Sequence, residues 1–191
     1  MTAIPRLLAF AGSTDAGCAT RRLLTVLADG ARDAGAQVSV IDLRDYPLPA
    51  SAARSPADAV PPQALALQQL MRDHDGLLVA TPEYSGAMPA LIRSTLNWLV
   101  ASLDGSASPL PGKVAGIVSS SSNGLAGLRA LQAVRDAMSG LGLVVVPQQV
   151  AVMQDKVGSD GQLKDDKQRA AVHAVGAAVA RLTAARLAVS S

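Results

Sequence analysis

The sequence has little of several residue types, and each shortage excludes a class of protein. Its 191 residues include one cysteine, which excludes a disulfide framework and a metal site built from several cysteines. The formal net charge is only +2 and aromatic residues make up 2% of the chain, so it lacks the basic, aromatic-rich surface of a nucleic-acid-binding protein. No apolar run approaches the ~18 residues that a membrane helix needs.

Apolar residues, by contrast, are abundant. A hydrophobic fraction of 49% and a mean hydropathy of +0.27 exclude a disordered chain. The length fits one domain, residues 1–191, with a substantial core. The N-terminus, MTAIPRLLAFAGST, has no basic region followed by a cleavable apolar stretch. We therefore expect a soluble, cytoplasmic protein that binds neither nucleic acid nor membrane.

Short apolar runs alternate along the chain with longer segments whose apolar residues recur at helical spacing. The short runs predict five β-strands, at residues 6–11, 37–43, 76–80, 113–119 and 141–146. The longer segments predict five helices, at residues 20–34, 61–72, 88–102, 124–139 and 164–189, the last with Val172, Val175, Val179 and Leu182 facing inward. Loops are expected at residues 44–60 and 154–167, the second with a turn at Asp160-Gly161.

This alternation predicts an α/β fold, in which a parallel sheet is covered by helices on both faces. In such sheets, ligands bind beyond the carboxyl ends of the strands. The loops of interest therefore follow the first, third and fourth strands, and they contain the least ordinary sequence of the chain.

The first of these loops runs from Gly12 to Thr20 and reads GSTDAGCAT. Two glycines, several hydroxyls and the start of a helix suit an anion such as phosphate. The same residues also fit a plain strand–helix turn with Thr20 as the N-cap, and both interpretations stay open. The loop matches neither a Walker A nor a G-x-G-x-x-G motif, and the carboxylate of Asp15 would repel a phosphate unless it points away.

The second and third loops read TPEYSGAMP (81–89) and SSSSNG (119–124). The second, stiffened by two prolines, either holds a planar heterocycle or is a connection that Tyr84 covers. Glu83 is expected to accept hydrogen bonds or to face solvent, because no second carboxylate or histidine accompanies it. The small polar residues of the third loop either donate to a ligand edge or form a flexible helix cap.

The remaining reactive residue types predict no further site. Cys18 lies at an expected helix N-terminus, but no histidine or second cysteine is near it in sequence to activate the thiol. His74 is expected to be exposed, and His173 to pack or to lie on the surface of the last helix. We expect no metal site and, since G-x-S-x-G is absent, no α/β-hydrolase nucleophile.

Two segments carry a resemblance to a known family. They are GST followed by TRRLL (Gly12 to Leu24) and TPEYSGAMPALIRSTLNWL (Thr81 to Leu99). Together they resemble the NADPH-dependent FMN reductases, a flavodoxin-like family that includes quinone and chromate reductases. The second segment is the more specific, because it matches the family's pattern at Pro82, Glu83, Tyr84, Pro89, Leu91 and Trp98. The resemblance covers nearly the whole chain and implies a flavodoxin-like three-layer sandwich with a five-stranded parallel sheet in the order 2-1-3-4-5.

The resemblance also implies a non-covalently bound FMN, which accepts hydride from NAD(P)H and passes the electrons to a quinone, free flavin, an azo compound or a metal oxyanion. No residue of the protein is then catalytic. A homodimer or homotetramer is implied, with the helix that contains Trp98 at the interface. The residues implied to hold FMN are Ser13, Cys18, Ala19 and Thr20 at the phosphate, Pro82, Glu83, Tyr84, Ser85 and Gly86 at the ring, and Ser119, Ser120, Ser121, Asn123 and Gly124 at its other edge.

The first loop departs from the family's Gly-Ser-x-Arg-x-x-Ser-x-Asn pattern. Asp15 stands where an arginine would pair with phosphate, and losing such a bond would weaken FMN binding by roughly one to two orders of magnitude. Cys18 and Thr20 replace the pattern's Ser and Asn, and Ser85 replaces the Asn after the tyrosine. The ring half of the site therefore matches better than the phosphate half, although Arg21 and Arg22 are close enough in sequence to compensate.

Two functions of different classes follow from these features. The chain is either an NAD(P)H-dependent flavin reductase or a non-catalytic flavodoxin-like homologue that binds flavin weakly or not at all and acts as an interaction or regulatory protein. Pro82-Glu83-Tyr84 favours the first and Asp15 the second. A phospho-receiver domain is disfavoured because the third strand ends in Thr81-Pro82 rather than an aspartate. A binder of another phosphorylated heterocycle stays open.

Overall fold

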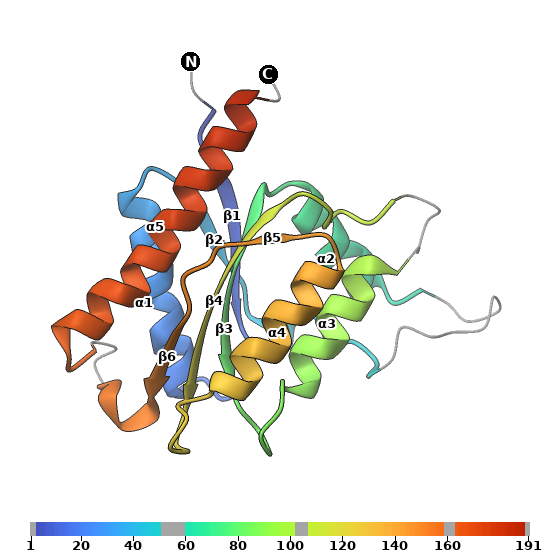
Figure 1. Cartoon of the computed structure of the whole chain (residues 1–191). Helices are drawn as coiled ribbons and strands as arrows, with labels where there is room; N and C mark the ends of the chain where they lie inside the picture. The colour runs from blue at the N-terminus through green and yellow to red at the C-terminus, as the bar shows by residue number, and fades with distance from the viewer. Residues whose placement is uncertain (1–2, 51–59, 102–106, 159–162, 190–191) are drawn as a thin grey trace.

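The computed structural model describes residues 3–50, 60–101, 107–158 and 163–189. Its centre is a parallel sheet between two layers of helices (Figure 1). The strand order is β2-β1-β3-β4-β5, and β6 also pairs with β4, so the predicted fold class and order are confirmed. The strands are β1 (Arg6–Ala11), β2 (Gln37–Val40), β3 (Gly76–Pro82), β4 (Val114–Ser121), β5 (Val144–Val145) and β6 (Val150–Met153).

The helices divide between the two faces of the sheet, as Figure 1 shows. On one face lie α1 (Ala19–Asp33) and α5 (Asp166–Val189), which bury apolar side chains such as Leu27 and Val175. The other face is covered by α2 (Pro62–Arg72), α3 (Ala90–Val100) and α4 (Leu128–Gly140). Each face therefore has its own apolar core, as the alternating sequence pattern predicts.

The helix boundaries differ from the predicted ones for local reasons. The helix predicted from 88 begins only at Ala90, after Pro89, and the one predicted from 124 begins at Leu128, because Gly127 has φ +91° and cannot be helical. Three predicted features lie outside the described residues. They are the end at residue 102 of the helix predicted from 88, residues 51–59 of the loop predicted over 44–60, and the turn predicted at Asp160-Gly161.

The second strand is shorter than predicted. It ends at Val40 instead of residue 43, and Leu43–Asp45 forms a 3₁₀ turn, η1. The side chain of Asp42 accepts a hydrogen bond from the backbone N–H of Arg44 at 2.9 Å, which favours the turn over continued pairing.

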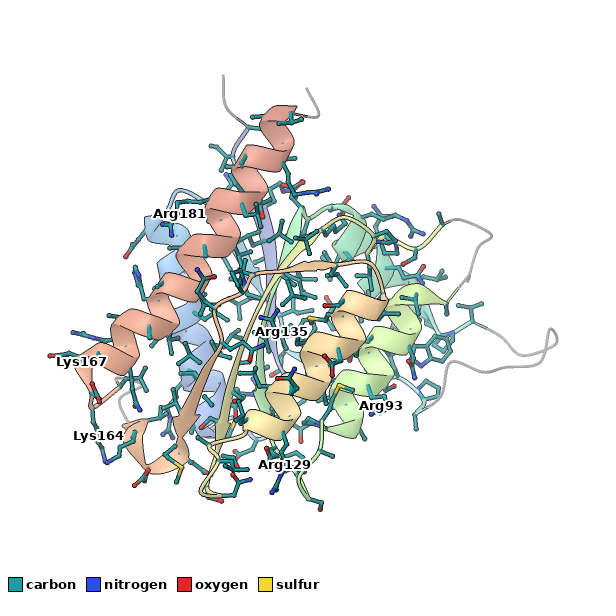
Figure 2. The ribbon with its side chains drawn as sticks, viewed as in Figure 1. Arg93, Arg129, Arg135, Lys164, Lys167 and Arg181 are labelled. Carbon is teal, nitrogen blue, oxygen red and sulfur yellow. The ribbon has the colours of Figure 1, made fainter. Side chains whose placement is uncertain are left out.

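The prediction of a single fifth strand over 141–146 is wrong. Only Val144 and Val145 pair with β4, and pairing resumes at Val150, so two short strands lie along the same edge of β4. Pro147 lies between them and has no N–H to donate to a ladder. From α4, Arg135 donates to the carbonyl of Val146, and its side chain points toward this interruption in Figure 2.

Helices α1 and α5 approach each other closely through two glycines. A Cβ built on Gly30 would lie 2.0 Å from the carbonyl oxygen of His173, and one on Gly176 would lie 2.0 Å from that of Leu27. By length and composition alone α5 could cross a membrane, although the sequence has no uninterrupted apolar run of that length. Core helices pass the same test, and α5 packs against α1 and the sheet.

Two predictions about burial are wrong. Leu182 is 37% exposed, and Thr183 takes the inward position on α5, where its hydroxyl donates to the carbonyl of Val179 at 2.7 Å. His74 is buried rather than exposed. Its Nδ1 lies 2.6 Å from the carbonyl oxygen of Leu70 and its Nε2 lies 2.8 Å from the hydroxyl of Ser39, so both ring nitrogens have partners that compensate for burial.

Candidate functional site

The loops that follow β1, β3 and β4 meet at the carboxyl edge of the sheet, around a cavity of about 280 Å³. This edge is at the bottom of the view in Figure 1. The cavity brings together nine residues that the resemblance assigns to FMN: Ser13, Cys18, Ala19, Thr20, Pro82, Glu83, Tyr84, Ser120 and Ser121. Three further residues line it: Asp15, Ser122 and Gln154. Five of the assigned residues lie outside its lining: Ser85, Gly86, Ser119, Asn123 and Gly124.

The loop between β1 and α1 is organised by its own side chains. Helix α1 begins at Ala19, with Cys18 at the N-cap and no side-chain cap, so the interpretation of Thr20 as the N-cap is wrong. Asp15 forms a local turn, because its Oδ1 accepts from the N–H of Gly17 at 2.9 Å. Ser13 and Thr20 are both 3% exposed.

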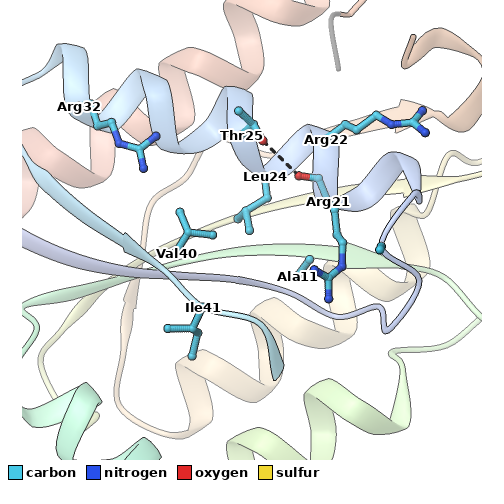
Figure 3. A pocket seen from close by; sticks show the side chains of 9 residues that line it. Ala11, Arg21, Arg22, Leu24, Thr25, Arg32, Val40 and Ile41 are labelled. Atoms are coloured by element: carbon cyan, nitrogen blue, oxygen red, sulfur yellow. Dashed lines mark hydrogen bonds between the residues drawn. The ribbon is translucent and has the colours of Figure 1, made fainter. Parts of the chain in front are cut away.

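Arg21 and Arg22 hold this loop from outside the cavity. Arg21 donates to the carbonyl of Ser13 at 3.3 Å and forms an ion pair with Asp42 at 2.6 Å. Arg22 donates to the carbonyl of Gly17 and, at 3.0 Å, to that of Gly158. Figure 3 shows the two side chains leaving α1 in different directions. Both guanidinium groups position loop carbonyls. Although they are close enough to Asp15 in sequence to compensate for it, neither lines the cavity.

The carboxylate of Asp42 is shared between two arginines. Arg21 contacts one of its oxygens, and Arg44 contacts the other at 2.6 Å. The hydrogen bond from Arg21, followed by that from Arg44, holds the pKa of Asp42 well below its usual range. This ion-pair network ties η1 to α1 and, through Arg21, to the loop after β1.

A larger cavity, of about 440 Å³, lies between α1 and β2 (Figure 3). Three arginines of α1 line it, together with exposed Val40 and its neighbour Ile41. Arg32, the third, bonds to Asp29 at 2.9 Å and to the carbonyl of Val38 at 3.4 Å. No residue from the β3 or β4 loops lines this cavity among the residues that the structure describes. The smaller cavity, which joins the three predicted loops, is therefore the better candidate for the site.

The loop after β3 is a tight turn that leaves an aromatic ring exposed. Tyr84 and Ala87 pair as a short bridge, and Ser85 (φ +51°) and Gly86 (φ +73°) form the turn between them. Tyr84 is 55% exposed, and its hydroxyl lies 3.5 Å from the hydroxyl of Ser13 across the cavity. Its ring is thus available at the mouth of the cavity.

The side chain of Glu83 is buried and bonded to protein groups. Its carboxylate accepts from the side-chain amide of Asn123 and from the backbone N–H groups of Arg129 (3.1 Å) and Ala130 (3.3 Å). The guanidinium of Arg129, near the N-terminal end of α4 in Figure 2, lies 3.9 Å from the same carboxylate. Glu83 is an acceptor, as expected, and it caps α4, where a negative charge is favourable.

Adjacent serines at the end of β4 have different surroundings. The hydroxyl of Ser119 donates to the carbonyl of Ala126 at 3.3 Å, away from the cavity. Ser120 lines the cavity, is 3% exposed, and its Oγ has no hydrogen-bond partner. Burying a hydroxyl without a hydrogen-bond partner costs free energy of folding. Ser120 is therefore the strongest candidate in the lining for a hydrogen bond to a polar ligand atom.

Gln154 reaches the cavity from the turn η2 (Gln154–Lys156), which follows β6. Gln154 is not among the predicted site residues, because β6 was not predicted. The run VAVM at Val150–Met153 is the signal that could have found the strand, and a residue just after a parallel strand is a candidate ligand contact.

Comparison with known proteins assigns the chain to a family. The model of the NADPH-dependent FMN reductase family matches residues 5–156, most of the chain. The chain belongs to the NADPH-dependent FMN reductase family. The predicted membership is confirmed, and FMN and NAD(P)H, the predicted cofactor and co-substrate, are those of the family.

Individual relatives are reductases, and each is matched over about half of its length or less. A segment of 86 residues is 33% identical to the NADH:(hydroxy)cinnamate reductase subunit CrdA of Vibrio ruber. The match covers 45% of this chain and 41% of that protein. A segment of 100 residues is 28% identical to the NADPH azoreductase of Bacillus sp. strain OY1-2 and covers 52% of each protein.

Among solved structures, FerB of Paracoccus denitrificans, a flavoenzyme NAD(P)H:(acceptor) oxidoreductase, has the same fold. It aligns with a TM-score of 0.78 and 21% identity, over 94% of this chain and 97% of its own.

Proposed function

We propose that the protein is an NAD(P)H-dependent flavin reductase that passes electrons to quinones, free flavin or metal oxyanions. The observation that carries the proposal is the hydroxyl-lined cavity at the carboxyl edge of the sheet, where three loops meet around the unpartnered Oγ of Ser120. Membership of the NADPH-dependent FMN reductase family supports a flavin in this place. Reductase relatives favour this function over the non-catalytic alternative.

The donors and acceptors of the cavity fit the ring and ribityl parts of a flavin. A bound flavin would supply the redox chemistry, taking hydride from NAD(P)H and giving electrons to the acceptor. The protein residues would only hold and expose it. Ser13 and Thr20 would contact the ribityl end, Pro82 and Tyr84 the ring, and Ser120 a polar edge of the ring. Glu83 and Asn123 would act indirectly, by fixing the loops after β3 and β4 to each other.

The cavity is slightly smaller than the ~300–1,000 Å³ typical of small-molecule sites. A flavin would therefore extend past its mouth, over the exposed Tyr84. A ring left partly open to solvent can accept many flat, conjugated electron acceptors by stacking, with few specific contacts. The proposed acceptors are accordingly a class rather than one compound.

We also propose that the protein is a cytoplasmic homodimer or homotetramer whose interface adjoins the site. Leu125 and Leu128, each 45% exposed, lie in and just after the loop that follows β4, and the N–H of the next residue, Arg129, donates to Glu83 of the cavity lining. Exposed apolar residues grouped beside a site are typical of an interface. Sedimentation equilibrium of the wild type and of Leu128→Asp tests this: the variant should shift toward monomer, and a monomeric wild type would contradict it.

The first test of the function is the visible absorption spectrum of the purified protein, followed by titration of the apo form with flavin. Flavin absorption bands, tight rebinding, and flavin-dependent oxidation of NADPH or NADH with a quinone are the expected results. A colourless protein that leaves saturating flavin free would contradict the proposal and favour the non-catalytic alternative. Asp136→Asn, on the exposed side of α4, serves as a control that should behave as wild type.

A further inference from the structure

The charges around the cavity oppose a phosphate. Among the described residues, its lining includes two carboxylates, Asp15 and Glu83, and no lysine or arginine. Glu83 has compensating donors at the start of α4, with Arg129 3.9 Å away. Asp15 is exposed on the loop after β1, the same loop that the family resemblance assigns to the phosphate of FMN. A phosphate placed there would meet a like charge at short range.

Asp15 also uses groups that would otherwise serve an anion. Its carboxylate accepts from the N–H of Gly17 at 2.9 Å, and its backbone carbonyl accepts from the N–H of Cys18 at 3.4 Å. These amides immediately precede α1, where the partial positive charge of a helix N-terminus attracts anions. The protein's own carboxylate thus partly offsets that charge.

The two nearby cations do not reverse this balance. Arg21 is bonded to Asp42 and to the carbonyl of Ser13, and Arg22 to the carbonyls of Gly17 and Gly158. To reach a phosphate in the cavity, either side chain would have to leave these acceptors. Arg21 would also have to leave a close ion pair.

The other polar groups of the cavity suit a neutral ligand. Serine and threonine hydroxyls and the amide of Gln154 both donate and accept, whereas a phosphate dianion only accepts. The hydroxyls of a ribityl chain likewise do both. The lining therefore matches the sugar alcohol and ring of a flavin and offers the phosphate no lysine or arginine side chain among the described residues.

We infer that the site recognises the uncharged riboflavin part of a flavin and gives no preference to the 5′-phosphate, so that free riboflavin binds as tightly as FMN. This inference rests on the proposed function and narrows it, because it adds an uncharged flavin to the ligands and substrates of the site. A site with an arginine or lysine bonded to the phosphate would instead favour FMN by roughly tenfold to a hundredfold.

The test is titration of the apo protein with riboflavin and with FMN at one fixed ionic strength, followed by the quenching of flavin fluorescence. We expect dissociation constants that differ by less than about threefold, well below the discrimination that an arginine or lysine bonded to the phosphate would give. Tighter binding of FMN by tenfold or more, with riboflavin also bound, would overturn this inference and leave the proposed function standing. Absence of binding by either flavin would overturn both.

Two variants locate the effect at Asp15. Asp15→Arg should tighten FMN at least about tenfold and leave riboflavin within about twofold, because only FMN carries the phosphate. Asp15→Asn, which can keep the turn at Gly17, should shift FMN in the same direction by a smaller factor. Asp136→Arg, an equal charge change on the exposed side of α4, should alter neither. Equal changes for both flavins in Asp15→Arg would indicate a rearranged loop and overturn the inference.

Discussion

The carboxylate of Glu83 lies 3.1 Å from the backbone N–H of Arg129, so a residue that follows β3 caps the helix that follows β4. The same carboxylate accepts from the side chain of Asn123. Two of the three loops that line the cavity are therefore connected through one buried side chain. The shape of the site at its ring end depends on Glu83 even though that side chain is occupied by protein donors.

Replacing Glu83 should destabilise the protein and loosen the site together. Glu83→Ala leaves three donors without an acceptor, so we expect it to lower the free energy of unfolding by about 2–4 kcal/mol. Glu83→Gln keeps one acceptor oxygen and should cost about half as much. Urea unfolding followed by the fluorescence of Trp98, the single tryptophan and a buried one, measures both. Asp136→Asn is the control, and an alanine variant as stable as wild type would contradict the capping role.

The sequence predicts best those elements whose burial is visible in the residues themselves. Strands β1, β3 and β4 are buried over nearly their whole length, and their continuous apolar runs mark them clearly. The edge of the sheet gives a weaker signal. Val144 is 39% exposed, and the interruption near Pro147 depends on the pairing with β4 and on the hydrogen bond from Arg135 to the carbonyl of Val146. The single strand predicted there is therefore wrong.

The sequence predicts which loops form the site, but not which of their side chains bond to one another. The resemblance placed the three loops together, and the parallel sheet explains why they meet. The partners of Glu83, by contrast, are at least 40 positions away in sequence, and those of His74 include Ser39 on β2. The polar neighbours of His74 suggest exposure, whereas its two hydrogen bonds stabilise it in the interior. Pairings of this kind follow from tertiary packing and leave no spacing pattern.

Ser120 and Ser119 form a matched pair for testing the ligand site. Ser120→Ala removes a buried hydroxyl that has no partner, so the apo protein should be as stable as wild type or more stable by up to about 1 kcal/mol. The same change should weaken flavin binding about threefold to tenfold, because a ligand atom loses a hydrogen bond. Ser119→Ala should instead lower the stability of the apo protein and leave flavin affinity unchanged, because the hydroxyl of Ser119 bonds to the carbonyl of Ala126 and does not face the cavity. Unchanged flavin affinity in Ser120→Ala would contradict the assignment.

The close contact of α1 and α5 requires glycine at positions 30 and 176. Gly30→Ala places a methyl group against the backbone carbonyl of His173, so the helices must separate, and we expect a loss of about 2–4 kcal/mol in unfolding free energy. Gly140→Ala, at the end of α4 with open space around it, is the control and should be neutral or slightly stabilising. Thermal unfolding of both variants makes the comparison, and equal melting temperatures would contradict the close packing.

Asp42 should make stability depend on pH in the acidic range. Its pKa is held below the ordinary value by Arg21 and Arg44, whereas in the unfolded chain it titrates near pH 4. The folded state thus binds this proton less readily than the unfolded state, so the contribution of Asp42 is present above about pH 5 and is lost as the pH falls through 4 and below.

Asp42→Asn should remove about 1–2 kcal/mol of unfolding free energy at pH 7 and flatten the dependence between about pH 5 and 3. Because Arg21 also holds the carbonyl of Ser13, the variant should weaken flavin binding as well. Urea unfolding of wild type, Asp42→Asn and the surface control Asp136→Asn across this range isolates the effect. The difference between wild type and Asp42→Asn must shrink as the pH falls, and a difference that is constant from pH 7 to 3 would show that Asp42 stabilises the fold without its charge.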